Sequence, residues 1–416
     1  MVQIQHRENK VSISGPVGML DFRRILAKIE GVRKETYPEL VLDFRACTAA
    51  QAGPMLAICS QCLKLRHSGL TISLLPPRDE KLARLFLNTN WAHLIDPTGF
   101  GASQNHGFAR VPATNFTSAA DQRSLVGTMV DALMKSMKGF SRPDLSAIEW
   151  ALSEITDNVL NHAQSPLGGF AQINILKAKR QIEYVVCDAG IGIPQSLRSG
   201  IPTITTDSEA LDHAIREGVT RDKKLGQGNG LFGSYQISRV SGGFFHIHSG
   251  SARLDYDQSL DLPRLSTEAI PYQGTLVVAS IDISRHDVLA KALRFTDGVY
   301  QPMDSIEYRY ESRDSASTDI ILRMREQASS FGSRVAGVAV RTKLRNLIDL
   351  SAQSRIIIDF SELPVISSSF ADEVIGKLFL ELGAVRFMKV LEFQHVSPTV
   401  RQIIDRAIAQ RSANET

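Results

Sequence analysis

Apolar and polar residues alternate with a clear helical period in the segment SRPDLSAIEWALSEITDNVLNHA, residues 141–163. Apolar side chains recur there at spacings of three and four, which matches the 3.6-residue turn of an α-helix. The segment AADQRSLVGTMVDALMKSMKG before it is also typical of a helix. We therefore expect a pair of helices here, the second with an apolar stripe of Leu145, Ile148, Leu152, Ile155 and Val159.

Four later segments have the patterns of strands. FAQINILKA and QIEYVVCDAG follow the helix pair, and GFFHIHS and GTLVVASIDI come further along the chain. Their apolar positions alternate or run continuously, as in half-buried or fully buried strands. Between the two strand pairs, residues 195–225 are polar and predict a mobile segment, which leads into GQGNGLFGSYQISRVSG. Together these segments predict a central α/β unit over residues 115–285.

The two ends of the chain resemble each other. ELVLDFRACTAAQAGPMLAI (39–58) and RIIIDFSELPVISSSFADEV (355–374) each run from an apolar strand into Asp-Phe, then through a loop into a predicted helix. Asp43 thereby corresponds to Asp359. We expect an α/β multidomain protein, with small α/β domains over 1–105 and 316–416, the central domain over 115–285 and a linker over 286–315.

Composition narrows the functional classes. The chain has 416 residues, of which 43% are hydrophobic and 22% charged, and this length predicts two or three domains. A formal net charge of +3 is too weak to indicate nucleic acid or an anionic membrane as a partner. The polar start MVQIQHRENK predicts no secretory signal, and no apolar run approaches the roughly 20 residues of a membrane span. We therefore expect a cytoplasmic protein.

Four cysteines offer one candidate metal or redox motif. Cys59 and Cys62 form C-x-x-C, but no second close Cys/His pair completes a set of about four zinc ligands. A redox pair is typical of a helix start, whereas this pair lies inside an apolar helical run. We interpret both as buried structural thiols.

The long helix carries the first candidate site. Glu154 and Asn158 are four residues apart, so they share one helix face, and Asn161 and His162 extend that face by a turn. A carboxylate there can orient a water or hydroxyl, and an amide oxygen can bind Mg²⁺. Taken alone, the same pattern also fits a solvated polar flank.

Two glycine-containing segments suggest a ligand. CDAGIGIP places Asp188, Gly190 and Gly192 at the end of an apolar strand, and GQGNGLFG places Gly226, Gly228 and Gly230 before a helix. Glycines let a ligand approach the backbone, and N–H groups at a helix start bind phosphate. The literal G-x-G-x-x-G in the second segment follows a charged segment rather than a strand, which excludes a Rossmann site, and no P-loop motif is present.

The order of these motifs resembles the GHKL ATPase superfamily of gyrase, heat-shock chaperone, histidine kinase and MutL-type proteins. Its features here are E-x-x-x-N on a helix, D-x-G-x-G, a glycine-rich loop and Gly274-Thr275 before a strand. The resemblance covers about 160 residues and is closest to the anti-sigma-factor serine kinase branch. It implies the α/β-sandwich Bergerat fold, with ATP and Mg²⁺ as cofactors.

The resemblance also implies residue roles. Glu154 would be the catalytic carboxylate and Asn158 the Mg²⁺ ligand, while Asp188 would bind the adenine amino group. Residues 195–225 would form an ATP lid, in which Lys223 or Lys224 could reach phosphate. The remaining nucleotide-binding positions would be Asn161, His162, Gly190, Gly192, Gly226, Gly228, Gly230, Leu231 and Thr275.

The terminal repeats resemble STAS-type domains, the small α/β modules of anti-sigma-factor antagonists. In that family a serine at the loop-to-helix junction is phosphorylated, and Ser368, within Ser367–Ser369, is the candidate here. The chain lacks the Asp and Gly that usually flank this serine, so a helix cap near Phe370 is the competing interpretation. The N-terminal copy has Gln51, Ala52 and Gly53 at this place and offers no hydroxyl.

Three functions remain open at this stage. The first is an ATP-binding regulatory protein that hydrolyses ATP and whose nucleotide state controls how the flanking domains bind a protein partner. The second is a serine kinase acting on a STAS-domain serine, and the third is an adaptor that holds ATP without turnover. A phosphoacceptor histidine is not indicated, since His286 has no following proline. A homodimer is compatible with the sequence, and a membrane partner is not expected.

Overall fold

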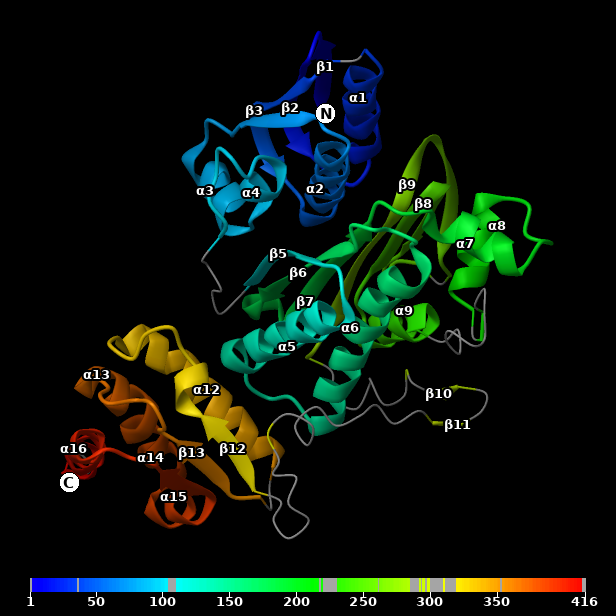
Figure 1. The fold of residues 1–416 in the computed structure, drawn as a ribbon. Coiled ribbons are helices and arrows are strands. Elements are labelled where there is room, and N and C mark those ends of the chain that lie inside the picture. The colour runs from blue at the N-terminus through cyan, green and yellow to red at the C-terminus, as the bar shows by residue number, and fades with distance from the viewer. Residues whose placement is uncertain are drawn as a thin grey trace. The chain divides into compact units, whose positions relative to one another are not determined.

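The computed structural model describes a mixed α/β protein with several sheets. The described residues are 2–35, 37–103, 110–216, 218–219, 230–260, 262–284, 319–351 and 354–413, with 292, 294–295, 298–299 and 310 between them. The chain forms two compact units, one of Met1–Met129 with Ala147–Gln301 and the other of Val130–Ser146 with Pro302–Thr416. The first unit contains both the N-terminal domain and the central sheet (Figure 1).

The N-terminal domain is a four-stranded sheet in the order β1-β2-β3-β4 with helices beside it. Its first two strands are antiparallel, and β2, β3 and β4 are parallel, so each parallel connection passes through a helix. The elements are β1 (Gln3–Arg7), β2 (Lys10–Val17), α1 (Phe22–Lys34), β3 (Glu39–Ala50), α2 (Ala52–His67), β4 (Thr71–Leu75), α3 (Glu80–Asn88) and α4 (Trp91–Ile95).

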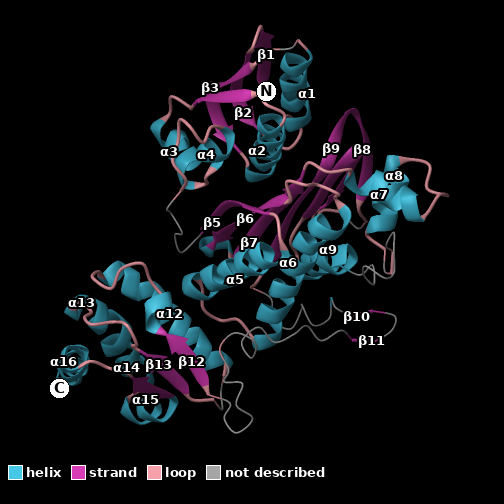
Figure 2. Ribbon diagram, viewed as in Figure 1, coloured by secondary structure: helices cyan, strands magenta, loops and turns pink. Residues whose placement is uncertain are grey.

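The central domain contains a five-stranded sheet in the order β5-β6-β7-β9-β8, with all neighbours antiparallel. Helices α5, α6 and α9 lie along one face of it (Figure 2). The strands are β5 (Arg110–Phe116), β6 (Gly169–Leu176), β7 (Gln181–Asp188), β8 (Phe245–Tyr256) and β9 (Arg264–Asp282), and the helices are α5 (Ala119–Ser136), α6 (Arg142–His162), α7 (Gly192–Gly200), α8 (Asp207–Ala214) and α9 (Gly230–Ser241). A two-residue pair, β10 (Arg294–Phe295) and β11 (Gly298–Val299), follows.

The predicted helix pair and the four predicted strand segments are present. The prediction of a mobile segment over residues 195–225 is partly wrong, because part of it is helical. Helices α7 and α8 occupy residues 192–200 and 207–214, and α8 packs against β8. Thr206 caps α8 through a complete capping box with Glu209, which satisfies backbone N–H groups at the helix start. These short helices have few apolar residues, and polar residues separate them in the sequence. The sequence therefore shows no long apolar stripe that would predict a helix there.

Helix α2 packs against the central sheet as well as its own domain. Every residue from Ala52 to Ser60 is buried, because α2 contacts β6, β7 and β9 in addition to β4 and α4. One hydrophobic core therefore continues from the N-terminal domain into Phe170, Val185 and Leu276 of the central strands. This arrangement buries the central sheet on both faces, which accounts for the continuous apolar run in β7.

Polar contacts fix the same interface. The Arg23 guanidinium donates hydrogen bonds to the carbonyl oxygens of Gly250 (2.6 Å), Ile270 (2.8 Å) and Ala252 (2.9 Å). Trp91 Nε1 donates to Gln172 Oε1 at 2.9 Å, and both side chains are buried. Such contacts are specific, since each buried polar group would otherwise lose its partner.

The second unit is built on a three-stranded parallel sheet in the order β12-β13-β14. Its connectivity repeats that of β2-β3-β4, and Asp359 ends the middle strand as Asp43 lies in β3. The elements are β12 (Ile320–Arg323), α12 (Arg334–Leu350), β13 (Ile356–Asp359), α13 (Ser368–Ala371), a π-helical turn (Asp372–Gly376), α14 (Lys377–Leu382), α15 (Ala384–Val390), β14 (Leu391–Gln394) and α16 (Pro398–Ala413).

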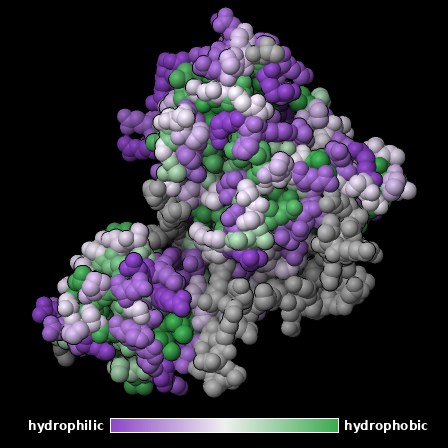
Figure 3. All heavy atoms as spheres, in the orientation of Figure 1, coloured by the Kyte–Doolittle hydropathy of each residue, from purple (hydrophilic) through white to green (hydrophobic). Residues whose placement is uncertain are grey.

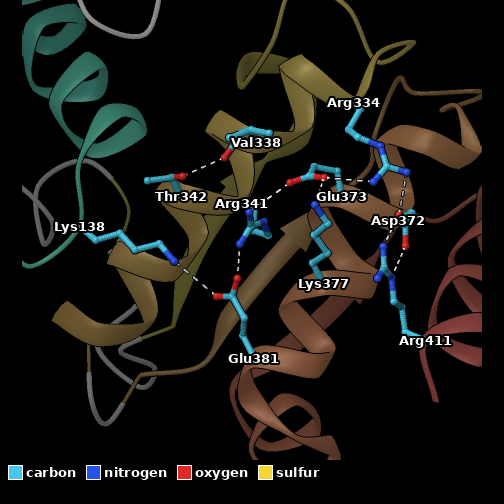
Figure 4. A network of polar contacts seen from close by, with 10 residues as sticks. All are labelled: Lys138, Arg334, Val338, Arg341, Thr342, Asp372, Glu373, Lys377, Glu381 and Arg411. Carbon is cyan, nitrogen blue, oxygen red and sulfur yellow. Dashed lines mark hydrogen bonds and ion pairs between the residues drawn. The ribbon is translucent and has the colours of Figure 1, made fainter. Parts of the chain in front are cut away.

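An ion-pair network joins the helices of this unit (Figure 4). The buried Glu373 carboxylate contacts Lys377 at 2.5 Å, Arg341 at 3.1 Å and Arg334 at 3.5 Å. Asp372 accepts two hydrogen bonds from Arg411 of α16, at 2.6 and 2.7 Å. A carboxylate this deeply buried is tolerated only with such partners, so the network fixes the packing of α12, the π-helical turn, α14 and α16.

Hydrophilic and hydrophobic residues are interspersed over the face of the molecule shown in Figure 3. Within the part of the chain that the structure describes, no helix combines the length and apolar character needed to cross a membrane.

We predict that Arg23→Ala lowers the free energy of unfolding of the first unit by about 2–4 kcal/mol, because three buried or partly buried carbonyl groups lose a charged donor. Urea unfolding followed by tryptophan fluorescence measures this, since Trp91 and Trp150 both belong to this unit. Arg24→Ala is the matched control, because Arg24 is exposed and pairs only at the surface with Asp21. Equal stability of the two variants would contradict the assigned role of Arg23.

Candidate functional site

Helix α6 determines where the predicted catalytic side chains lie. Its apolar stripe is buried, so the adjacent face with Glu154 and Asn158 runs along the edge of the packed surface, and both side chains are half-buried. On the far side, Gln122 of α5 donates to Thr156 Oγ1 at 2.9 Å and to the Ser153 carbonyl at 3.2 Å. These contacts fix the rotation of α6 and hence the direction of the Glu154 face.

The Glu154 carboxyl lies against the start of α9. A Cβ placed on Gly230 would overlap the Glu154 carboxylate, so glycine permits this approach. Burial, followed by the negative charge of Asp157, raises the pKa of Glu154 to about 7. A carboxyl group with this pKa near neutral pH is suited to accept a proton.

Asp188 is buried at the end of β7. Its Oδ1 accepts a hydrogen bond from Gly190 N at 2.8 Å, and Thr275 donates to the same carboxyl group through its backbone and hydroxyl. Burial raises the pKa of Asp188 to about 6, while these hydrogen bonds and the Lys64 charge oppose the shift. The structure thus brings Thr275 of β9 to Asp188 and Gly190, although Thr275 lies far from both along the chain.

The glycines of this turn permit close backbone packing. A Cβ on Gly190 would overlap the carbonyl oxygen of Ala163, which also accepts a 2.8 Å hydrogen bond from Ile191 N. Gly274 has φ +112°, and a Cβ there would overlap the Asp188 carbonyl. Gly192 begins α7 with φ +78°, beside Ser249 Oγ. The requirement for glycine at these positions therefore comes from the turn itself.

The remaining predicted positions have distinct surroundings. Asn161 Nδ2 donates to Asp157 Oδ2 at 2.9 Å, and His162 is half-buried in the last turn of α6. Leu231 packs against the small core of Leu197, Ile204, Ala210 and Ala214, which links α9 to α7 and α8. Gly226, Gly228, Lys223, Lys224 and His286 lie outside the described residues.

Helix α6 connects the two groups of residues. Gly230 meets it at Glu154 and Gly190 meets it at Ala163, nine residues later, which places these points about 13 Å apart along the axis. A ligand along this face would be contacted by Glu154 and Asn158 at one end and by the Asp188 turn at the other.

Two residues near Asp188 were not identified from the sequence. Tyr272 donates its hydroxyl to the Asp188 carbonyl at 2.9 Å, and Lys64 Nζ of α2 donates to the Ala189 carbonyl at 3.4 Å. Tyr272 lies two residues before Gly274, and this closeness to a predicted motif is a sequence feature that points to it. Lys64 is 125 residues from its partner and lies in another domain, so nothing local pointed to it.

In the second unit, the serine run begins a helix. Ser367 Oγ accepts a hydrogen bond from Phe370 N at 3.0 Å, which confirms the predicted helix cap, and Ser368 and Ser369 are exposed. Cys59 and Cys62 are free and buried, as predicted, and burial raises the pKa of Cys62 to about 12.

Comparison with known proteins identifies one part of the chain. Residues 337–401 match a family model described as a STAS-like domain of unknown function (DUF4325), so this segment is similar to a STAS-like domain. The match runs from α12 into α16 and covers well under half of the chain. No curated protein matches the chain.

We predict that Glu154→Gln stabilises the first unit at pH 8 by about 2 kcal/mol and has little effect at pH 4. The native state holds the Glu154 proton more tightly than the unfolded state, since its pKa is raised to about 7 from the usual glutamate value of 4.5. Wild-type stability therefore falls as the pH rises through this window, and the amide removes that loss. Thermal unfolding at both pH values measures the difference, with exposed Glu39→Gln as control.

Proposed function

We propose that the protein is a Mg-ATP-binding regulatory protein whose central domain has a Bergerat-type nucleotide site of the GHKL class. One observation carries the proposal: α6 meets the Asp188–Gly190 turn at Ala163 and the start of α9 at Glu154. The five-stranded antiparallel sheet with α5, α6 and α9 on one face is compatible with this fold.

The chemistry of the residues fits a purine nucleotide. Asp188 is buried, and its carboxyl group can accept a hydrogen bond from an exocyclic amine while Thr275 and Gly190 N orient it. The first turn of α9 begins at Gly230, and N–H groups at such a start favour phosphate oxygens. The half-buried Glu154 carboxyl, with its pKa near 7, is the group that can orient or deprotonate an attacking water.

Magnesium fits the same face. Asn158 is half-buried and supplies an amide oxygen, a ligand that this hard cation accepts. Among the described residues no group of three or more His, Cys, Asp or Glu could hold a metal. Mg²⁺ needs no such group, because it is commonly held by one or two protein oxygens, waters and substrate phosphates. When bound it would neutralise phosphate charge.

Regulation would pass through the flanking domains. The segment similar to a STAS-like domain lies in the second unit, and the N-terminal domain repeats its parallel strand order. We propose that the nucleotide state changes how these domains bind a protein partner, which requires only that ATP favour one of two conformations.

We predict that Glu154→Gln retains Mg-ATP binding but loses at least about 100-fold in phosphate release, as expected for removal of a general base. Asp188→Asn should lose nucleotide binding with little change in melting temperature, because the amide presents two donors where the carboxylate presents acceptors only. Titration calorimetry and a phosphate-release assay on the full chain measure both. Unchanged turnover in Glu154→Gln would refute its catalytic role, and retained affinity in Asp188→Asn would refute the adenine assignment.

A serine kinase is the second candidate, favoured by the exposure of Ser368 and Ser369 at the start of α13. With γ-labelled ATP, a kinase acting on its own chain would transfer label to protein, and Ser368→Ala would abolish it. Ser367→Ala separates the cap from the acceptor: it should weaken the helix by about 1 kcal/mol and leave labelling intact. Label released only as free phosphate would favour the ATPase.

A further inference from the structure

The face of the central sheet opposite α6 is covered by the N-terminal domain, and this contact continues up to the Asp188 turn. Cys59 of α2 is buried close to Cys187, the residue before Asp188, and Ser60 hydrogen-bonds the Cys187 thiol. One turn further along α2, Lys64 Nζ donates to the carbonyl oxygen of Ala189. Helix α2 thus follows β7 as far as the turn itself.

A second contact reaches the same turn from α1. The Phe22 ring packs edge-on against Tyr272, with ring centroids 5.3 Å apart, and the Tyr272 hydroxyl donates to the Asp188 carbonyl. The two residues whose carbonyl groups form the turn, Asp188 and Ala189, are therefore each held by a side chain that the N-terminal domain supplies or supports. These two hydrogen bonds restrain the position of the turn.

The start of α2 is closely packed against the central sheet. A Cβ on Gly53 would lie 2.7 Å from Val278 Cγ2 of β9 and 2.7 Å from Met19 Sδ. Gly53 and Ala52 occupy the place where the C-terminal repeat has Ser369 and Ser368, which are exposed. The N-terminal copy thus has a close contact with the central sheet where the C-terminal copy has exposed hydroxyl groups.

We propose that the N-terminal domain acts as a fixed part of the nucleotide site, with Lys64 as the positioning residue that holds the Asp188–Gly190 turn in its binding conformation. This inference rests on the proposed function, since it concerns the affinity of that site. Lys64 does not touch the ligand; it acts through the turn and through its charge.

The charge gives Lys64 an effect that a purely structural contact lacks. The groups facing the Asp188 carboxyl are Thr275 and Tyr272 of β9, Cys187 of β7 and Lys64 of α2, of which Lys64 is the cation. Its charge favours the ionised carboxylate and opposes the rise in the pKa of Asp188 that burial causes. Nucleotide affinity should fall as the pH drops through the pKa of Asp188, and loss of Lys64 should move that fall to higher pH.

The test is Lys64→Met in the full chain, with Lys64→Arg to restore the charge and exposed Lys28→Met as the matched control. Calorimetry with a non-hydrolysable ATP analogue and Mg²⁺ from pH 5.5 to 8.5 gives the affinity of each. We expect Lys64→Met to bind about tenfold more weakly at pH 7, as loss of a charged contact implies. Its affinity profile should shift to higher pH, while the other two variants follow wild type and melting temperatures stay close.

The outcomes separate the two claims. The ligand's own titration is common to all four proteins, so a shift confined to Lys64→Met identifies Asp188 as its source. If the wild-type protein binds the analogue and Lys64→Met has the same affinity at every pH, the inference is wrong and the proposed function still stands. A uniform loss in Lys64→Met without a pH shift also overturns the electrostatic role. Wild type that does not bind the analogue overturns both claims.

Discussion

Burial of the central sheet on both faces is the constraint on which the rest of the first unit depends. Helices α5, α6 and α9 cover one face, and α2 with its neighbours covers the other, so β7 lies in a continuous apolar core. A strand in this position ends abruptly where the chain must turn, and Asp188 stands at that end. The raised pKa of Asp188 is a direct consequence of that burial.

The candidate site is built on the same packing. Ala163 at the end of α6 and Gly274 of β9 approach the Asp188 turn so closely that side chains are excluded at Gly190 and Gly274. At the other end of the face, Gly230 lets α9 begin against Glu154. The packing of the protein itself thus requires glycine at these positions. The proposed nucleotide would bind a surface that this packing forms.

The two terminal repeats share one strand order, but the helix after the Asp-Phe strand has different surroundings in each. In the first, the helix after the Asp-Phe strand is buried against another sheet and carries Ala52, Gly53 and small thiols at the contact. In the second, the corresponding helix starts with exposed serines and is held by the charged network of Arg334, Glu373 and Arg411. The family match covers this second copy, whereas the first has only the shared strand order and the Asp-Phe sequence.

The sequence alone determined what depends on local periodicity and on motif order. The α6 stripe predicted its helix, the apolar runs predicted β6, β7 and the paired parts of β8 and β9, and the repeat predicted two similar α/β domains, because each signal lies within about twenty neighbouring residues. It could not find α7 and α8, whose few apolar residues are buried by contacts with each other and with β8, β9 and Leu231 of α9. Nor could it find Lys64 or Arg23, since a lysine or arginine looks solvated until a distant segment supplies its partners. Tertiary structure decided those contacts, because residues more than a hundred positions apart meet only when two domains share one core.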